Sequence, residues 1–469
     1  MKEIEVGASP AAYLEDGAIR WGNEMLLLSN ILTFQPSSSD DGPRIQIITY
    51  ETAPKNRRQE RNYLLKFKSN KVADEWSEKL EAKLKRRIPP HLVDRKLRNR
   101  VLVLVNPYSG QKKAIKCWEE EAKPTLEKAK IDYDHRETEQ VGHGTAIALE
   151  CPIDRYDAVL IVSGDGLVAE FVNGLLLRKD RTRALKIPIC HIPGGTSNAL
   201  AAAVCFVCNE KFPAWNLFPR EMTLMVARPR FMPLRLFRVD TEYNGSKPMF
   251  LSAAWGLIAD IDIGSERFRW AGLMRLHMEA WIRVMRLPQT CKYRCRISYV
   301  PLGDEKVARK TLLKYDAARH LFGRDHFEYA DIEPATGQEE ILQEHFSSLD
   351  AALCDQESYE IPPLSEPFRW PLHPSSRLDD SFMYLALVEW GTIRNRFQIA
   401  DLLVRMDGSN HLLNTAFQLI PVRACRIEPI GPQECSGYFA VDGEALKNNS
   451  KFQVVPIAHS ATVIGRDEV

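Results

Sequence analysis

The sequence lacks the long apolar run that a membrane-spanning helix needs, although 45% of its 469 residues are hydrophobic. Its amino terminus, Met1 to Glu5, is charged and has no apolar core of the kind found in signal peptides. A formal net charge of +1 provides no overall positive field that would favour nucleic acid. These absences predict a cytoplasmic protein that does not bind nucleic acid, and the length suggests about three domains.

The sequence also has few signs of a metal centre or of a common nucleotide loop. Its 10 cysteines are scattered, many in apolar surroundings, as small buried hydrophobic residues are. Cys205-x-x-Cys208 and Cys291-x-x-x-Cys295 have metal-like spacing, but each is a lone pair without a nearby histidine. There is no Gly-x-x-x-x-Gly-Lys-Ser/Thr loop and no protein-kinase catalytic loop. We therefore expect no metal site built from a protein cluster, and a nucleotide would need a different loop system.

One stretch suggests how the chain is organised. Residues 157–162 are a short, almost wholly apolar run of β-forming residues, which is typical of a strand buried on both faces. The run ends at Ser163-Gly164-Asp165-Gly166, and from Leu167 apolar residues recur at helical spacing. This pattern places Asp165 at the carboxyl end of a parallel strand, where open α/β sheets bind ligands. The alternative is a tight turn in which Asp165 only caps the next helix.

Two further segments repeat this pattern. One apolar strand precedes Asn106-Pro107-Tyr108-Ser109-Gly110, two lysines and a helical stretch, and residues 187–192 lead into Pro193-Gly194-Gly195-Thr196-Ser197-Asn198-Ala199-Leu200. Right-handed crossovers would place the three turns on one edge of a single sheet. Thr138 and Glu139, at the end of another predicted strand, would join that edge. Helix amino termini with glycine and hydroxyl residues make a cradle for phosphate groups.

Three motifs in this order resemble the catalytic fold of the diacylglycerol kinases. They are Asn106-Pro107, Ser163-Gly164-Asp165-Gly166 and Gly194-Gly195-Thr196-Ser197-Asn198-Ala199. Within that superfamily the chain resembles the sphingosine kinases, over residues of about 98–303 and about 382–465. The resemblance implies an α/β catalytic lobe that binds nucleotide, followed by a β-rich lobe that binds lipid.

The resemblance also implies the residues of the site, with Asp165 as the general base. The residues it implies for the nucleotide lie in the turns, in an arginine pair and in a late hairpin: Asn106, Pro107, Tyr108, Thr138, Glu139, Gly166, Glu170, Gly195, Thr196, Ser197, Arg269, Arg275, Asp442, Gly443 and Glu444. Those it implies for the lipid are Ser163, Gly164, Asp165, Ser252, Asp262, Met406 and His411. ATP would be the co-substrate and would bring Mg²⁺, with Asp442 and Glu444 near the metal.

The chemistry of the substrate gives a separate reason to expect an acidic residue. An apolar β-run ends in Asp260 and Asp262, which point the same way if the chain is still extended. A cationic amine in a partly apolar cleft needs a fixed carboxylate, because burying an unpaired charge is costly, whereas diacylglycerol has no cation. Arg269 and Arg275 flank a glycine and are suited to clamp phosphates. The alternative is that the aspartates pair structurally with Arg267 or Arg269.

The flanking regions predict further elements. Residues 1–95 resemble a pleckstrin-homology-like β-barrel, with short antiparallel strands and a closing helix that carries Trp76. Such modules often bind phosphoinositides or proteins, and a purely structural or autoregulatory role is the alternative. The basic run after that helix, up to Pro90, is expected to be a solvated linker. Residues 304–378 are expected to be a polar insertion, mostly loop with a short helix at 338–346.

The last part of the chain returns to strands. From Phe382 strand patterns resume, with a helix at 399–406 and Asp442-Gly443-Glu444 as a hairpin turn. Residues 275–286 predict an amphipathic helix that either packs on the body or serves as an apolar flap toward a lipid tunnel or membrane.

Together with these patterns, the resemblance implies an ATP-dependent lipid kinase that is cytoplasmic, associates peripherally with membranes and acts on sphingosine or dihydrosphingosine. Its domains would be residues 1–95, 98–230 and 231–465, and a homodimer is possible. The alternatives are a ceramide or diacylglycerol kinase, and a catalytically silent lipid- or phosphoinositide-binding adaptor.

Overall fold

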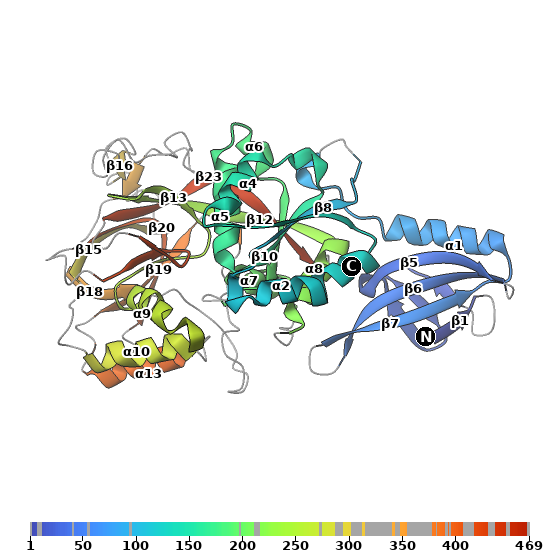
Figure 1. The fold of residues 1–469 in the computed structure, drawn as a ribbon, viewed down its shortest axis with the longest axis horizontal. Coiled ribbons are helices and arrows are strands. Elements are labelled where there is room, and N and C mark those ends of the chain that lie inside the picture. The colour runs from blue at the N-terminus through green and yellow to red at the C-terminus, as the bar shows by residue number, and fades with distance from the viewer. Residues whose placement is uncertain are drawn as a thin grey trace.

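The chain folds into an amino-terminal β unit, a central α/β lobe and a β-rich lobe, which lie in a row (Figure 1). The computed structural model describes residues 2–6, 12–39, 42–53, 57–92, 96–196, 198–210, 216–271, 274–286, 294–301, 312–314, 340–342, 348–353, 378–380, 382–389, 393, 395–406, 417–429, 437–446 and 451–466. No helix in this part of the chain is long and apolar enough to span a membrane.

The amino-terminal unit consists of two small sheets and one helix. Its elements are β1 (Lys2–Glu5), β2 (Ala12–Leu14), β3 (Ala18–Trp21), β4 (Glu24–Leu27), β5 (Ile31–Ser39), β6 (Gly42–Ala53), β7 (Arg57–Lys66) and α1 (Asn70–Lys83). One sheet has the order β1-β7-β6-β5 and the other β2-β3-β4. Ser69 caps α1, and Trp76 packs edge-on against Phe67 in the core of the unit. The predicted strands and closing helix are confirmed, and two strands were not predicted from the sequence, the parallel strand β1 and the antiparallel strand β2.

The α/β lobe is built from parallel strands that alternate with helices. Its elements are β8 (Arg100–Val105), α2 (Lys113–Cys117), α3 (Lys123–Lys128), β9 (Asp132–Glu137), α4 (His143–Glu150), β10 (Ala158–Ser163), α5 (Asp165–Leu177), α6 (Arg181–Ala184), β11 (Pro188–Pro193), α7 (Ala199–Val207) and α8 (Phe218–Ala227). The strands run in the order β11-β10-β8-β9, all parallel. Every residue of β10 and β11 is buried, as their apolar sequences predict.

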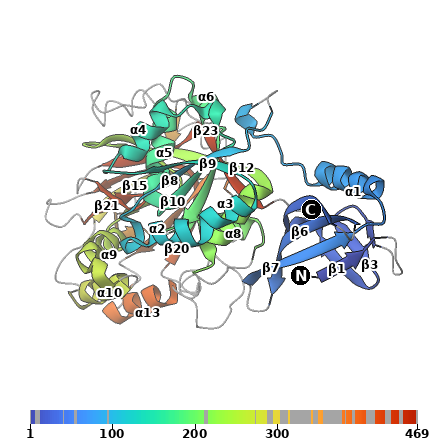
Figure 2. The same ribbon diagram turned by 45° about the vertical axis from the view of Figure 1, so that its right-hand side comes forward.

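The β-rich lobe contains the remaining elements. They are β12 (Pro229–Thr241), β13 (Gly245–Met249), β14 (Ala253–Trp255), α9 (Leu257–Ser265), α10 (Met274–Arg286), β15 (Arg294–Pro301), β16 (Leu312–Lys314), β17 (Glu340–Leu342), β18 (Ser348–Leu353), β19 (Met383–Glu389), α13 (Arg396–Met406), β20 (Phe417–Pro429), β21 (Phe439–Val441), β22 (Glu444–Leu446) and β23 (Phe452–Arg466). Figure 2 shows α9, α10 and α13 gathered below the strands.

One long strand connects the two lobes. The first residues of β23 pair with β20, and its later residues Thr462 and Val463 pair in parallel with β11. The antiparallel partner β12 follows β23 along nearly its whole length. The lobes therefore share one 11-stranded sheet, so their relative position is set by backbone hydrogen bonds.

Two local predictions are wrong. Asp260 and Asp262 lie on helix α9 rather than in an extended strand, so they do not point the same way. Within 338–346, residues 340–342 form strand β17 instead of a helix. The region 304–378 also contributes β18 to the main sheet, between β15 and β19, so it is not wholly an insertion outside the fold.

Candidate active site

The three predicted turns lie together at the carboxyl edge of the parallel strands. The Asn106 N–H donates to the carbonyl of Val162 at 3.2 Å, and the Gly194 N–H donates to that of Ser163 at 2.9 Å. The Gly164 N–H donates to the hydroxyl of Ser109 at 3.1 Å. The turns after β8, β10 and β11 are therefore bonded to each other, which confirms the predicted common edge.

Glycine is required where the first and third turns meet. Gly110 has a φ of +56°, and a Cβ built on it would lie 2.3 Å from the carbonyl oxygen of Gly194. Asn198 fixes the third turn, because its side chain accepts from the Gly195 N–H at 3.0 Å and donates to the Gly195 carbonyl at 2.9 Å. Thr196 lies in this turn, and Ser197 lies outside the described residues.

Asp165 is buried at the centre of this edge, with 5% of its surface exposed. Its two carboxylate oxygens accept from the N–H groups of Ala199 and Leu200 at 2.9 and 3.0 Å. Asp165 thus caps α7 rather than its own helix α5. The bond to Ala199 spans 34 residues of sequence and joins the turn after β10 to the turn after β11. A carboxylate offers about four lone-pair positions, so two bonds leave capacity for another donor.

A buried histidine beside Asp165 was not among the predicted site residues. His191, on β11, has 2% of its surface exposed, and its Nε2 lies 2.9 Å from the carbonyl of Ser163. Because a carbonyl oxygen only accepts, Nε2 carries the hydrogen. The other ring nitrogen, Nδ1, lies 3.6 Å from an oxygen of Asp165. A polar residue inside an otherwise apolar strand was the signal that would have identified it.

Other predicted nucleotide residues occupy the same edge with differing roles. Thr138 follows β9 and is buried, with its N–H bonded to Val105. Tyr108 is 69% exposed. The carboxylate of Glu170 accepts from the N–H groups of Gly142 and Gly144 at 3.0 and 2.9 Å, where α4 begins. Glu170 therefore fixes the loop after Thr138, together with Glu139, whose N–H bonds to His143.

Asp442 fixes the segment that carries Ser252 within the β-rich lobe. The Asp442-Gly443 turn joins β21 to β22 as predicted, with positive φ at both residues. The Asp442 carboxylate accepts from the N–H groups of Phe250, Leu251 and Ser252 at 3.1, 3.0 and 2.9 Å. Burial raises the pKa of Asp442 to about 7, against these hydrogen bonds, and the negative charge of Asp165 adds to the rise. The two aspartates are thus close enough to interact.

The predicted lipid and phosphate residues on α9 and α10 form ion pairs. Arg275 pairs with Glu266 and lies 4.0 Å from Asp262. Burial raises the pKa of Asp262, and the charge of Arg275 opposes that rise. Asp260 is buried and accepts from Arg283 at 2.8 Å, so it has a structural role, although with a different arginine from those predicted.

The remaining predicted residues either form an ion pair or lie outside the described part of the chain. Glu444 pairs with Lys247 at 3.2 Å. The side chains of Arg269 and Met406, and all of His411, lie outside what the structure describes. Among the described residues no group of three His, Cys, Asp or Glu side chains could hold a metal ion.

Comparisons with known proteins agree with this geometry. The diacylglycerol kinase catalytic domain model matches residues 100–228. Human sphingosine kinase 1 is 31% identical over 349 residues, which cover 74% of this chain and 86% of that protein. Sphingosine kinase 1 of Arabidopsis thaliana is 28% identical over 396 residues, which cover 80% of this chain and 73% of that protein. A crystal structure from Bacillus anthracis str. Sterne, provisionally described as a diacylglycerol kinase, shares the fold. Its TM-score is 0.50 at 16% identity, over 79% of this chain and 97% of that one.

The fold, the matching catalytic-domain model and the similar enzymes thus define a lipid kinase with a diacylglycerol-kinase catalytic domain. Within that class, the 31% identity to the human enzyme, which extends over most of both sequences, indicates the family. The chain belongs to the sphingosine kinase family.

Proposed function

We propose that the protein transfers the γ-phosphoryl group of ATP to the primary hydroxyl of a sphingoid base, either sphingosine or dihydrosphingosine. The observation that carries the proposal is the position of Asp165, buried between three bonded turns at the carboxyl edge of the sheet. The names of the curated relatives supply the substrate class, since they are described as sphingosine kinases.

The phosphates of ATP bind, in this proposal, along the turns that hold Asn106, Gly195, Thr196 and Ser197. Small residues at helix amino termini suit close approach by phosphate. Arg275 is available as a phosphate ligand only if it leaves Glu266, its present partner. A triphosphate carries more negative charge than one carboxylate, so exchange of partners is electrostatically favourable.

Asp165 acts as the general base. As the primary hydroxyl attacks the γ-phosphorus, the new O–P bond forms, the bond to ADP breaks and the hydroxyl proton passes to Asp165. In a loose transition state the proton leaves late, so an ordinary carboxylate is sufficient and correct positioning dominates the rate. The two backbone N–H groups that hold Asp165 supply this positioning.

Mg²⁺ accompanies ATP in this proposal rather than occupying a protein cluster. The described donor set does not fit a resident ion. Asp442 already accepts three backbone hydrogen bonds, and its pKa of about 7 leaves much of it protonated at neutral pH. Glu444 is paired with Lys247. No step of the reaction is therefore assigned to a metal held by these residues.

The amine of the sphingoid base pairs with Asp262, and Ser252 lies in the same headgroup pocket. Asp262 has a side chain that is 41% exposed, and its cationic neighbour Arg275 is already paired with Glu266. A partly buried carboxylate whose cationic neighbour is shared with a second carboxylate is stabilised when another cation binds beside it. Ceramide and diacylglycerol, which carry no amine cation, would gain nothing from this group.

Residues 1–95 are proposed to be a pleckstrin-homology-like regulatory unit that assists peripheral membrane association. The two small sheets and the closing helix α1 are consistent with that class.

The substrate assignment is tested with Asp262→Ala. A hydrogen bond between charged groups contributes about 1.5–3 kcal/mol, so KM for sphingosine should rise roughly 10- to 100-fold. Asp74→Ala, which removes an exposed carboxylate on α1, should leave KM unchanged. An unaltered KM for sphingosine in Asp262→Ala would refute the role of this residue and would favour a neutral lipid substrate.

A further inference from the structure

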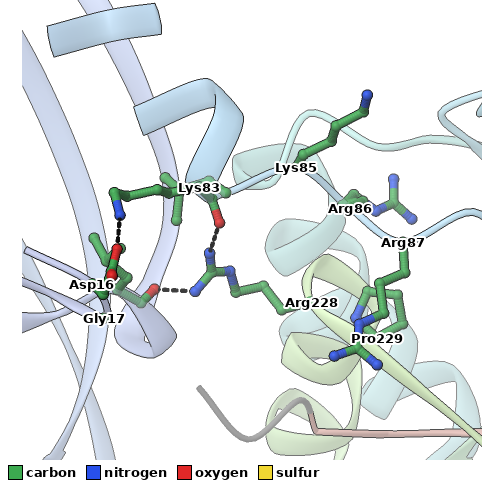
Figure 3. Close-up of a pocket in the computed structure, with 10 residues that line it drawn as sticks. Asp16, Gly17, Lys83, Lys85, Arg86, Arg87, Arg228 and Pro229 are labelled. Atoms are coloured by element: carbon green, nitrogen blue, oxygen red, sulfur yellow. Dashed lines mark hydrogen bonds and ion pairs between the residues drawn. The ribbon is translucent and has the colours of Figure 1, made fainter. Parts of the chain in front are cut away.

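A cavity lies where the amino-terminal unit meets the α/β lobe. Its volume is about 220 Å³, several times the roughly 30 Å³ that one water molecule occupies in the liquid. Figure 3 shows that its walls come from the β2–β3 turn, from the chain just after α1 and from the end of α8. The ionisable residues that line it are Asp16, Lys83, Lys85, Arg86, Arg87 and Arg228.

The cavity is strongly cationic. Five of its ionisable side chains are basic and only Asp16 is acidic. Asp16 is already engaged, because it pairs with Lys83, whose ammonium lowers the pKa of that carboxyl. Lys85 is exposed and bonds to no residue that the structure describes. The whole chain has a net charge of only +1, so this concentration of positive charge is local.

Arg86 is largely buried, with 15% of its side chain exposed. It donates to Asn99 at 3.0 Å, but its Nε has no partner among the described residues. The nearest carboxylate, Asp157, is 4.0 Å away and already accepts from the N–H groups of Arg98 and Asn99. Burial lowers the pKa of Arg86, so its positive charge is incompletely compensated.

Arg228 holds the walls together. Its guanidinium donates to the carbonyl of Leu28 in the amino-terminal unit and to that of Lys83 at the end of α1. The run after α1 was expected to be a solvated linker. Instead, three of its basic residues line a cavity whose walls are joined across the domain boundary, so the cavity is a fixed structural feature.

The cavity is separate from the catalytic edge. Asp157, beside Arg86, directly precedes β10, whereas Asp165 follows β10. A strand of six residues spans about 20 Å, so the two sites lie at opposite ends of one strand.

We propose that this cavity is a second binding site, which takes an anion carrying phosphomonoester groups. Lysine and arginine donors match the several oxygens and the double negative charge of such a group, and arginine binds them as a fixed fork. A phosphoinositide headgroup and a free inositol phosphate share this chemistry. The proposal concerns binding alone and does not depend on which lipid the enzyme phosphorylates.

The test measures binding to the full chain by calorimetry and by vesicle sedimentation. Three probes are used: inositol trisphosphate, phosphatidylcholine vesicles that contain phosphatidylinositol bisphosphate, and phosphatidylserine vesicles of matched charge. The variant Lys85→Ala/Arg87→Ala removes two exposed cations from the cavity. The control Lys71→Ala/Lys79→Ala removes two exposed cations from α1 outside the cavity. Thermal unfolding establishes that both variants are folded.

We expect the phosphoinositide or its soluble headgroup to bind the wild type and the control alike, and at least tenfold more weakly to the cavity variant. Binding of inositol trisphosphate as well as vesicles would support the site with either source. Binding of vesicles alone, still lost in the cavity variant, would support it with the lipid as the source. Absence of binding by both phosphate probes would overturn the proposal. So would binding that the cavity variant retains, or equal binding of phosphatidylserine vesicles.

Discussion

The substitution Asp165→Asn tests whether Asp165 has a catalytic role in addition to its structural role as a helix cap. The carboxylate accepts two backbone hydrogen bonds at the start of α7, and asparagine offers only one acceptor oxygen. One buried N–H then faces an amide N–H₂ group, which costs about 1–3 kcal/mol of the free energy of unfolding. Removal of a general base lowers turnover by about 10²–10⁴-fold. Because native stability is about 5–15 kcal/mol, most molecules remain folded, so unfolding cannot account for such a loss.

Asp157→Asn is the matched control for this variant. Asp157 stands at the other end of the same strand, is 1% exposed and also accepts two backbone hydrogen bonds, from Arg98 and Asn99. The same substitution therefore removes a buried acceptor of the same kind, away from the catalytic edge. Its loss of stability should be at least as large, since Arg86 also loses a nearby charge.

The assay pairs urea unfolding with phosphoryl transfer from labelled ATP to sphingosine. We expect both variants to unfold at lower urea concentration than the wild type. Asp157→Asn should retain turnover within a few-fold, whereas Asp165→Asn should lose at least about 100-fold. If Asp165→Asn kept turnover comparable to that of Asp157→Asn, Asp165 would be a helix cap only, and the catalytic assignment would be refuted.

Three further outcomes are expected. Gly110→Ala should raise KM for ATP and destabilise the fold by at least about 1–2 kcal/mol, because a Cβ meets Gly194 at a positive φ; ATP titration and thermal unfolding would show this. The folded-state pKa of Asp442, about 7, exceeds the unfolded value of about 3.9. Its contribution to stability is therefore full below about pH 4 and lost as pH rises through 7, so Asp442→Asn should remove this part of the pH dependence of the urea midpoint. Arg58→Ala leaves Glu221 buried beside fewer cations, which should cost about 3–5 kcal/mol of the free energy of unfolding at the domain boundary. The segment after α1 should then be cut more readily in limited proteolysis, and an unchanged digestion pattern would contradict this.

The parts of the fold that sequence could predict are those with local signals. Each strand that ends at one of the three predicted turns is a short, mostly apolar run closed by glycine or asparagine, so β8, β10 and β11 could be located from sequence alone. The shared edge then follows from the handedness of βαβ crossovers. The hairpin at Asp442 was also predictable, because an Asp-Gly turn favours positive φ.

The failures arise where the signal is ambiguous or distant. The run from Phe250 to Ala259 is mostly apolar, and such a run fits a strand or a buried helix equally well. Gly256, at a φ of +81°, lies between β14 and α9. Asp260 and Asp262 therefore lie on a helix, where residues two positions apart point to different sides. Nothing near Asp442 in sequence indicates that it binds the backbone of residues about 190 positions earlier. Contacts of that kind depend on the pairing of β14 with β21, which are distant in sequence, and no local pattern encodes that pairing.

The central claim is tested most directly by incubating the wild-type protein with labelled ATP and Mg²⁺ against sphingosine, ceramide and diacylglycerol in parallel. We predict that label appears on sphingosine, at the primary hydroxyl, and on neither neutral lipid. Label on a neutral lipid in place of sphingosine would contradict the assigned substrate and the role of Asp262, and absence of label on all three would contradict the assignment as a kinase.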